Sequence, residues 1–593
     1  MRLNLHEQIA LVLSLLRWSA LGCGVGLLAG ASSAAFLAGL EWATRTRMEA
    51  PWLLWLLPAA GAAIGWVYAR FGRDVEGGNN LLLERIHRAE GDVSWRMAPL
   101  IALGTIGTHL FGGSAGREGT AVQMGGSLAD SLGRLVRLDP RDRRILLMSG
   151  ISGGFGAVFG TPLAGTIFGL EVLAVGRIRY DALAPCFVAS TVGDLACQWL
   201  GIGHHSYHVA VAPAVTPALL AWTALAGVCF GAASLAFAEL THAVQHLAKA
   251  LVGRAWLRPA LGGAAVIALT LAVGTRDYLG LGLPLIERSF EPGGVVAWAF
   301  ALKIVFTAVT LGTGFKGGEV TPLFCIGATL GHAFAGLTGQ PAPAFAALGF
   351  VAVFAGAANT PLACVLMGIE LFGAPLAVPL TLACIVSYVT SGHRGIYMSQ
   401  QIDTPKASRV VVADGLSLRD ARSGSLSVEP FWMRPLPGRE DEATPSRGGG
   451  GMSEESTFRA RPFGQLRIFL RSGERPKAGG WRGRLSNPPF SHLILQRARD
   501  FGLAHGTVKH CVSGFVDRGQ VQHEHAEYGN ARLPIYVELH GSRESLERFC
   551  LESPELLAGR MIVYKDVERW GWHDADFEEA ALDGPDDAGG ETA

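Results

Sequence analysis

The stretch Gly112-Gly113-Ser114-Ala115-Gly116-Arg117-Glu118-Gly119-Thr120 decides the fold, because a glycine-rich turn leads here directly into the apolar segment that begins at Ala121. Such a turn leaves backbone N–H groups free at a helix N-terminus, which binds anions through its amides and its dipole. A carboxylate at Glu118 can occupy the anion's place when charged and leave it when protonated. The alternative is that Arg117 pairs with a neighbour and Glu118 only caps the helix.

The composition of the surrounding chain places this turn in a membrane. Only 47 of the first 405 residues are charged, against 53 of the last 188. An ordinary soluble domain has about 25% charged residues, so the first 405 residues are too apolar to be one. Apolar stretches of about spanning length recur through them, which predicts a multi-pass, all-α membrane domain over residues 1–405. These stretches cover residues 51–69, 97–113, 145–175, 217–238, 257–275, 294–313, 342–369 and 374–391.

Charge gives further expectations about partners and orientation. The formal net charge is zero, so no overall field favours nucleic acid. The N-terminus has no small-residue cleavage signal, and we interpret it as a retained first helix. The Arg-rich stretch 134–144 favours the cytoplasmic side. An ionisable residue within a membrane segment, such as Glu118, indicates function.

A second stretch, Gly317-Gly318-Glu319-Val320-Thr321-Pro322, has the same design as the first. Glycines precede a predicted helix that carries Pro322 in its first turn, where proline is favoured. Thr321 offers a hydroxyl donor, and Glu319 adds a second acid. These residues, with Gly318 and Val320, are candidates for the anion or proton pathway.

Two weaker candidates complete the predicted site. In Glu76-Gly77-Gly78-Asn79-Asn80-Leu81, Asn79 can donate an amide N–H to an anion at the start of an apolar turn, although Gly-Gly-Asn-Asn is also an ordinary turn. Tyr397 is weaker still, because a tyrosine at a membrane interface is common.

The apolar part also contains an internal repeat. Residues 160–165 read GTPLAG and residues 359–364 read NTPLAC, and each copy is followed by an apolar run that ends in an acid, Glu171 or Glu370. Two halves with Gly/Pro-interrupted helices at matching places indicate a transporter site at the repeat interface. A duplication without a central site is the alternative.

The C-terminal part is predicted to face water. Residues 406–460 contain several prolines and the run Gly448–Gly451, which predicts a flexible linker. Residues 461–570 show the pattern βαββαβ, which predicts an α+β ferredoxin-like domain. The expected elements cover 466–470, 492–502, 507–516, 533–539, 542–557 and 561–567. The tail, 571–593, is acidic and expected to be disordered.

These motifs resemble the CLC family of chloride channels and transporters over residues 10–400. GREG (116–119), GGEVTP (317–322) and the two TPLA boxes fall in that family's order and spacing. The resemblance implies two inverted repeats of tilted and broken helices, a homodimer with two separate pores, and both termini in the cytoplasm. It also implies that Glu118 is the external gate and proton carrier, and that Asn79 and Tyr397 take the places of the family's central serine and pore tyrosine.

Departures from the usual family pattern resemble its fluoride-exporting branch. Thr120 follows GREG where most members have proline, and the usual Gly-x-Phe-x-Pro box reads GEVTP (318–322). Asn79 in the first motif, GREGT (116–120) and GEVTP together resemble that branch. The inner proton-relay glutamate of the chloride/proton exchangers falls at Val172. The resemblance therefore implies fluoride export coupled to proton import across a bacterial inner membrane, with Glu319 and Thr321 as an alternative proton route. The anion-binding set includes Gly78, Asn79, Asn80, Gly116, Arg117, Gly119, Gly318, Val320 and Tyr397.

Other functions stay open at this stage. One alternative is a chloride or nitrate channel or exchanger of the same fold, and another is a sensor that signals through the C-terminal domain. With its stretches ARDFGL (498–503) and VSGF (512–515), that domain resembles a PII-like family of unknown role, which implies a small-molecule effector. No nucleophile triad or phosphate loop supports an enzyme, and no cofactor is expected.

Two histidine groups could bind a metal, but they lack acid or Cys partners at fixed spacing, so solvated loops are the simpler interpretation. They are His204, His205 and His208, and His523 with His525.

Overall fold

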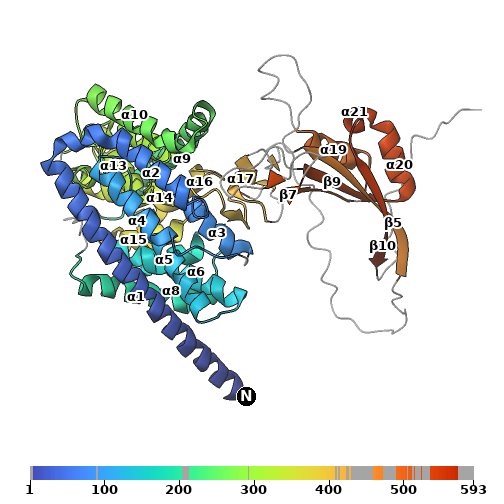
Figure 1. The fold of residues 1–593 in the computed structure, drawn as a ribbon, viewed down its shortest axis with the longest axis horizontal. Coiled ribbons are helices and arrows are strands. Elements are labelled where there is room, and N and C mark those ends of the chain that lie inside the picture. The colour runs from blue at the N-terminus through green and yellow to red at the C-terminus, as the bar shows by residue number, and fades with distance from the viewer. Residues whose placement is uncertain are drawn as a thin grey trace, which may run out of the picture. The chain divides into compact units, whose positions relative to one another are not determined.

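The computed structural model describes residues 5–88, 91–203, 213–291, 293–407, 410–411, 415–422, 427–428, 459–471, 489–503, 505–510, 513–514, 522–523 and 534–571. The chain divides into two compact units, Met1–Met433 and Arg434–Ala593, which are described separately (Figure 1).

The first unit is helical and contains two sets of helices that follow one another along the chain. The first set comprises α1 (Leu5–Glu49), α2 (Leu57–Phe71), α3 (Gly78–Arg88), α4 (Met97–Leu110), α5 (Glu118–Leu135), α6 (Pro140–Phe159), α7 (Pro162–Glu171) and α8 (Leu183–Trp199). The second set comprises α9 (Pro217–Leu251), α10 (Arg258–Val273), α11 (Leu283–Ser289), α12 (Ala299–Gly312), α13 (Val320–Thr338), α14 (Ala342–Ala358), α15 (Pro361–Phe372) and α16 (Ala377–Thr390). Short 3₁₀ helices cover Pro51–Leu56, Tyr180–Ala182, Ala255–Leu257 and Ala374–Leu376.

The two sets pack in the same way, which confirms the repeat predicted from the sequence. Helix α5 packs on α6 as α13 packs on α14, and α4 packs on α5 as α12 packs on α13. Likewise α1 packs on α8 as α9 packs on α16. Helices α7 and α15 contact each other across the two repeats.

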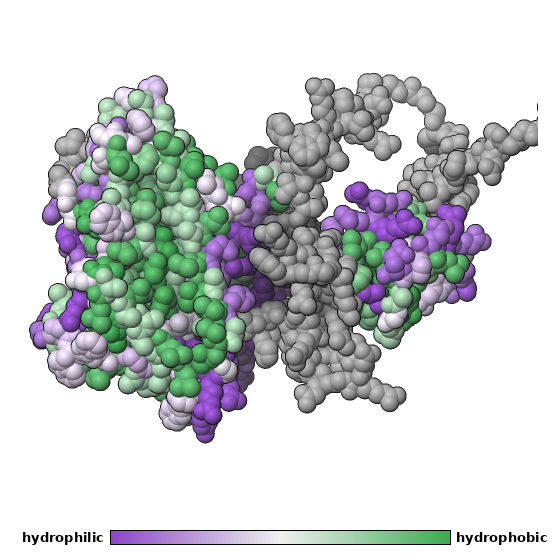
Figure 2. Space-filling view, turned by 90° about the horizontal axis from the view of Figure 1, so that it is seen from above, coloured by the Kyte–Doolittle hydropathy of each residue, from purple (hydrophilic) through white to green (hydrophobic). Residues whose placement is uncertain are grey.

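The helices of the first unit suit a bilayer. Among the described residues, five helical segments are long and apolar enough to cross a membrane: Gln8–Glu49, Pro51–Phe71, Pro217–Leu251, Ala255–Val273 and Val320–Thr338. Others are shorter apolar helices of 10–17 residues. In Figure 2 hydrophobic side chains cover a broad face of this unit, and hydrophilic ones gather toward its edges. Such a surface matches a hydrocarbon environment.

Each TPLA box marks a break between two helices. Gly160 ends α6 with φ 71°, and Asn359 ends α14 with φ 57°, so both lie in the left-handed region. Pro162 and Pro361 then stand in the first turn of α7 and α15, where a missing N–H costs nothing. The two apolar stretches predicted at 145–175 and 342–369 therefore each hold two helices.

The segment after α16 belongs to the first unit. Strand β1 (Ala174–Val175) pairs in parallel with β2 (Gln401–Ile402). The short helix α17 (Leu418–Asp420) follows, and Leu418 is buried beside Val175 and Ile402. The linker predicted from residue 406 therefore starts too early, because a few apolar side chains anchor residues 415–422 to the helical unit. Two further short strands, β3 (Val410–Val411) and β4 (Ser427–Val428), pair antiparallel.

The second unit has the predicted ferredoxin-like order. Its elements are β5 (Arg459–Arg471), α19 (Phe490–Asp500), β6 (His505–His510), β9 (Pro534–Gly541), α20 (Arg543–Glu552), α21 (Pro554–Leu557) and β10 (Ile562–Gly571). The sheet order is β10-β5-β9-β6, all antiparallel. A two-residue pair, β7 (Ser513–Gly514) with β8 (Gln522–His523), lies outside this sheet. Alternating residues of β5 and β9 form the core against α19 and α20.

Glu538 lies on the face of this sheet opposite α19 and α20, and its carboxylate predicts that the stability of the domain falls in acid. Glu538 Oε2 accepts from Arg467 Nε at 2.8 Å and its Oε1 from Lys509 Nζ at 2.7 Å. Burial alone would raise the pKa of Glu538, but these hydrogen bonds outweigh it and hold the pKa below the ordinary value of 4.5. A depressed pKa contributes stability that is present above the unfolded-state pKa and lost as the pH falls through the folded-state pKa.

We therefore expect Glu538→Gln to lower the melting temperature of the second unit at pH 7 and to flatten its decline in acid. Calorimetry of the full chain in detergent, from neutral pH down to about pH 3, measures both effects. Glu544→Gln, at an exposed position on α20, is the control. A variant that melts like the wild type at neutral pH would contradict this expectation.

Candidate functional site

The two glycine-rich loops meet where the repeats face each other. Gly116 N donates to Gly318 O at 2.6 Å, and Gly318 N donates to Gly116 O at 2.9 Å. This antiparallel bridge fixes the start of α5, which begins at Glu118, next to the start of α13, which begins at Val320. Two helix N-termini with their free amides therefore converge inside the helical unit.

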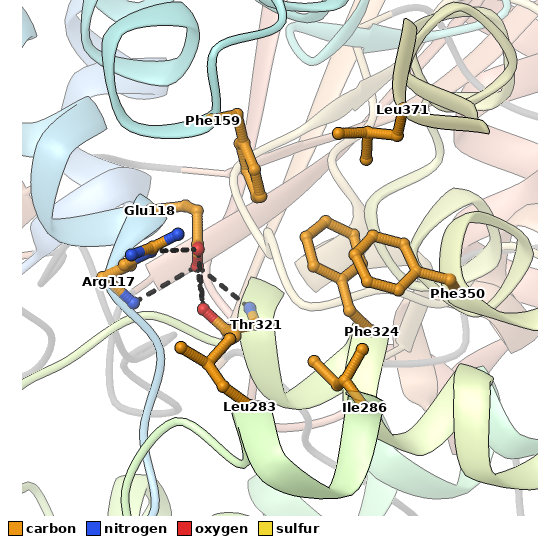
Figure 3. Close-up of a pocket in the computed structure, with 9 residues that line it drawn as sticks. All are labelled: Arg117, Glu118, Phe159, Leu283, Ile286, Thr321, Phe324, Phe350 and Leu371. Carbon is orange, nitrogen blue, oxygen red and sulfur yellow. Dashed lines mark hydrogen bonds and ion pairs between the residues drawn. The ribbon is translucent and has the colours of Figure 1, made fainter. Parts of the chain in front are cut away.

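The carboxylate of Glu118 is fully buried and binds the N-terminus of α13 (Figure 3). Thr321 N donates to Glu118 Oε2 at 2.9 Å, and the Thr321 hydroxyl lies 2.6 Å from both carboxylate oxygens. Arg117 adds its backbone N–H at 3.2 Å and its Nε at 3.4 Å. The Glu118 carboxylate thus contacts the N-terminus of a helix of the other repeat, in addition to starting its own helix.

A small cavity adjoins this carboxylate. It is lined by Arg117, Glu118, Phe159, Leu283, Ile286, Thr321, Phe324, Phe350 and Leu371. The cavity has a volume of about 20 Å³, which is room for roughly one water-sized particle. In Figure 3 the rings of Phe159, Phe324 and Phe350 stand across the cavity from the carboxylate. The edge of an aromatic ring carries partial positive charge, so a ring that turns its edge toward an anion does not repel it.

A second cavity is lined by both of the weaker candidates, Asn79 and Tyr397. It is lined by Asn79, Leu82, Leu83, Val122, Ile151, Phe168, Val172 and Tyr397. Tyr397 is 4% exposed, and its ring centroid lies 6.5 Å from that of Phe168. The structure therefore brings Asn79 and Tyr397 together, although they lie far apart in the sequence.

Asn79 and Glu319 both approach Gly119. A side-chain carbon at Gly119 would lie 3.1 Å from Asn79 Nδ2 and 3.6 Å from Glu319 Oε2. It would also lie 3.0 Å from the backbone of Gly318, so only glycine leaves this space free. Among the described residues, neither Asn79 Oδ1 nor Glu319 Oε2 has a hydrogen-bond partner, although both atoms are buried. Polar atoms without partners are rare in folded proteins and mark places where an ion, water or proton can bind.

Three of the predicted anion-binding residues take other places. Asn80 Oδ1 accepts from Ser399 N at 3.0 Å, so its side chain holds the loop that carries Tyr397. Gly78 has a φ of 55° at the start of α3, where a side chain would be strained. Val320 is 1% exposed and does not line either cavity.

A larger groove, which we call the outer groove, borders the first cavity. It is lined by Leu37, Leu40, Glu41, Thr44, Arg45, Met48, Glu49, Arg117, Ile202, Gly203, Leu281 and Leu283. Arg117 and Leu283 line both the groove and the cavity beside Glu118. The groove and the cavity beside Glu118 therefore adjoin at these two residues.

Some residues of the site had no signal in the sequence. The aromatic and aliphatic residues of the first cavity are single apolar positions within apolar helices. The hydroxyl of Thr120, noted only as a departure from proline, pairs with that of Thr105 at 2.7 Å, and both are fully buried. His204, His205, His208 and His525 lie outside the described residues.

An apolar two-repeat helical unit, with a carboxylate seated on a buried helix N-terminus beside a small cavity that a larger groove borders, defines a membrane anion-transport protein. The chain belongs to the CLC family, since the family model described as voltage gated chloride channel matches residues 60–392. A second model, of the uncharacterized DUF190 family, matches residues 465–569, which agrees with the predicted PII-like domain.

Similar proteins cover the helical unit. A chloride/fluoride channel protein of Pseudomonas syringae pv. tomato is 50% identical over 410 residues, which are 68% of this chain and 90% of that protein. An H(+)/Cl(-) exchange transporter of Cronobacter sakazakii is 26% identical over 434 residues, 66% of this chain and 91% of that protein. The crystal structure of a CLC-type fluoride/proton antiporter is 34% identical, with a TM-score of 0.64 over 66% of this chain and 98% of that chain.

Proposed function

We propose that this protein exports fluoride in exchange for protons. The observation that carries the proposal is the position of Glu118, whose carboxylate occupies an anion site on α13 and is itself able to take up a proton. When it is charged it fills the site. When it is protonated it binds the amide and hydroxyl of Thr321 more weakly and can leave the site to an anion.

Fluoride rather than chloride is supported by the donors of the site and by the relatives. Fluoride is small and strongly hydrated, so its dehydration is offset only by several strong hydrogen bonds. The Thr321 hydroxyl and amide and the Asn79 amide supply such donors along the path. A fluoride/proton antiporter and a chloride/fluoride channel protein are among the similar proteins.

Proton coupling then gives fluoride export a driving force. Proton entry down its gradient releases free energy that can move the anion outward. Glu118 is the carrier that we propose for the proton, and Glu319, with its buried unpartnered oxygen, is the candidate for the next step. The family resemblance puts Val172 where the chloride/proton exchangers have their inner glutamate, so we expect the route to differ from theirs.

Reconstituted vesicles test the function directly. Vesicles loaded with fluoride or with chloride are diluted into anion-free buffer, while an ion-selective electrode follows the anion and a trapped dye follows lumenal pH. We expect fluoride efflux with acidification of the lumen, and little chloride efflux. Chloride efflux with fluoride retained would contradict the proposal and favour the chloride branch. Anion efflux without any pH change would point to a channel.

Asn79→Ser is expected to reduce selectivity for fluoride over chloride by about tenfold, because the shorter, rotating serine hydroxyl replaces the more fixed amide donor, and a charge-assisted hydrogen bond is worth about 1.5 kcal/mol or more. The ratio of initial efflux rates in the same vesicles measures this effect. Asn80→Ser is the matched control, because Asn80 faces Ser399 and not the cavity. An unchanged ratio in the Asn79 variant would show that its amide does not select the anion.

The homodimer, the cytoplasmic position of both termini, the inner-membrane location and the effector of the C-terminal domain stay predictions of the family resemblance.

A further inference from the structure

Lys303, on α12, is a buried cation that the proposed exchange does not yet use. Its side chain is fully buried, and Nζ donates to Ser114 Oγ at 2.9 Å, to Gly280 O at 2.8 Å and to Tyr278 O at 3.2 Å. Three acceptors match the three N–H bonds of an ammonium group. The geometry of the site therefore suits an ammonium group.

No carboxylate of the described residues forms an ion pair with this ammonium. The titratable groups around it are the guanidinium of Arg47, the imidazole of His109 and the thiol of Cys325. Buried charges are ordinarily paired with an opposite charge. Because Lys303 has only dipoles as partners, its positive charge is not cancelled locally.

The two loops that Lys303 holds are walls of the proposed anion path. Ser114 belongs to the loop that leads to Glu118, four residues further on, so the two Cα atoms lie within about 14 Å of each other. Gly280 precedes Leu281 and Leu283, which line the outer groove. A side-chain carbon at Gly282, between these leucines, would lie 3.2 Å from Lys303 Nζ. The ammonium therefore lies directly behind the groove wall.

Comparison of the two repeats indicates that a loop of this kind does not need a lysine to hold it. Gly116 and Gly318 pair across the bridge, and other positions correspond at the same spacing. The corresponding pairs are Thr105 with Thr307, Thr108 with Thr310, and Ile101 with Lys303. The threonines recur in both repeats, while the first repeat has buried Ile101 at the place of the lysine. A loop of this kind can thus be packed without a cation.

We propose that Lys303 is a fixed internal cation that draws anions from the outer groove toward Glu118. The inference rests on the proposed anion transport and adds an affinity-determining residue to it. In a medium with an effective dielectric constant of about 20, a unit charge changes the binding of an anion roughly tenfold at a separation of about 12 Å, and by more at shorter separations. Because the ammonium is separated from the groove by its wall, it acts on the potential and does not bind the ion.

The test compares Lys303→Met with Thr307→Val in fluoride-loaded vesicles. The first variant removes the charge, whereas the second removes only the Thr307 hydroxyl, which contacts Ser114 Oγ at 2.9 Å and leaves the charge in place. We expect Lys303→Met to raise the half-saturating fluoride concentration about tenfold with less effect on the maximal rate. Thr307→Val is expected to stay within about twofold of the wild type.

Equal half-saturating concentrations in wild type and Lys303→Met would overturn the inference. It would also be overturned if both variants lost only maximal rate, because Lys303 would then serve loop packing alone. If Lys303→Met is not monodisperse in detergent, Lys303→Gln is used, which is also neutral but keeps hydrogen bonds. Wild-type vesicles in the same series separate the two proposals. If the wild type moves neither fluoride nor chloride, the proposed function fails first.

Discussion

Glu118→Gln is expected to abolish proton movement coupled to anion efflux, with a fall of at least about 100-fold in proton flux, the usual contribution of a positioned proton-transfer group. Glutamine fills the same volume and can still accept from Thr321, but it cannot take up and release a proton. Glutamine resembles the protonated side chain, so the anion path should no longer close when the pH rises. Fluoride efflux and lumenal pH, recorded together in vesicles, measure the ratio of the two fluxes.

The matched control for this variant is Glu41→Gln. Glu41 lies in the outer groove and pairs with Arg45 at 2.8 Å, but both side chains are about two-thirds exposed. An exposed pair of this kind contributes little, so the control should retain coupled exchange. If Glu118→Gln still moves protons with fluoride at the wild-type ratio, then another group carries the proton and Glu118 is only a gate.

Much of the fold and part of the site could be predicted because they depend on local chain chemistry. A glycine run before an apolar segment predicts a free helix N-terminus, and both GREG and GGEVTP are such places. Alternation of apolar residues predicts the strands of the second unit. The contact between Glu118 and Thr321 follows once the two N-termini are placed at the repeat interface.

The remaining residues could not be predicted because only tertiary packing decides which side of an apolar helix they face. Phe159, Phe324 and Phe350 resemble every other phenylalanine of the membrane segments until the helices are assembled. Lys303 is a single lysine in an apolar stretch, which could equally have pointed to the membrane surface. The partners of Glu171 and Glu370 cannot be predicted for the same reason, although each acid stands at the same place in its copy of the repeat.

These two acids form a reciprocal clasp between the repeats. Glu171, at the end of α7, accepts from the backbone N–H groups of Leu362 at 3.1 Å and Ala363 at 2.9 Å, in the first turn of α15. Glu370, near the end of α15, accepts from those of Leu163 at 2.9 Å and Ala164 at 2.8 Å, in the first turn of α7. Each helix therefore supplies the carboxyl group whose oxygens accept from the N-terminal amides of the other.

We expect Glu171→Gln to lower the free energy of unfolding by about 2–3 kcal/mol, because a glutamine carboxamide offers a single oxygen to two N–H groups and no charge to the helix dipole. Glu370→Gln should cost less, since its side chain is only half-buried.

Unfolding of the purified protein in mixed micelles of mild detergent and dodecyl sulfate measures both single variants and the double variant. Because the two carboxylates hold the same pair of helices, opening one clasp should weaken the other. The loss in free energy of unfolding in the double variant should therefore be smaller than the sum of the two single losses, by at least about 0.5 kcal/mol. Glu41→Gln again serves as the control, with an expected change within about 0.5 kcal/mol. Additive losses would show that α7 and α15 stay together without the clasp and that each carboxylate only caps one helix.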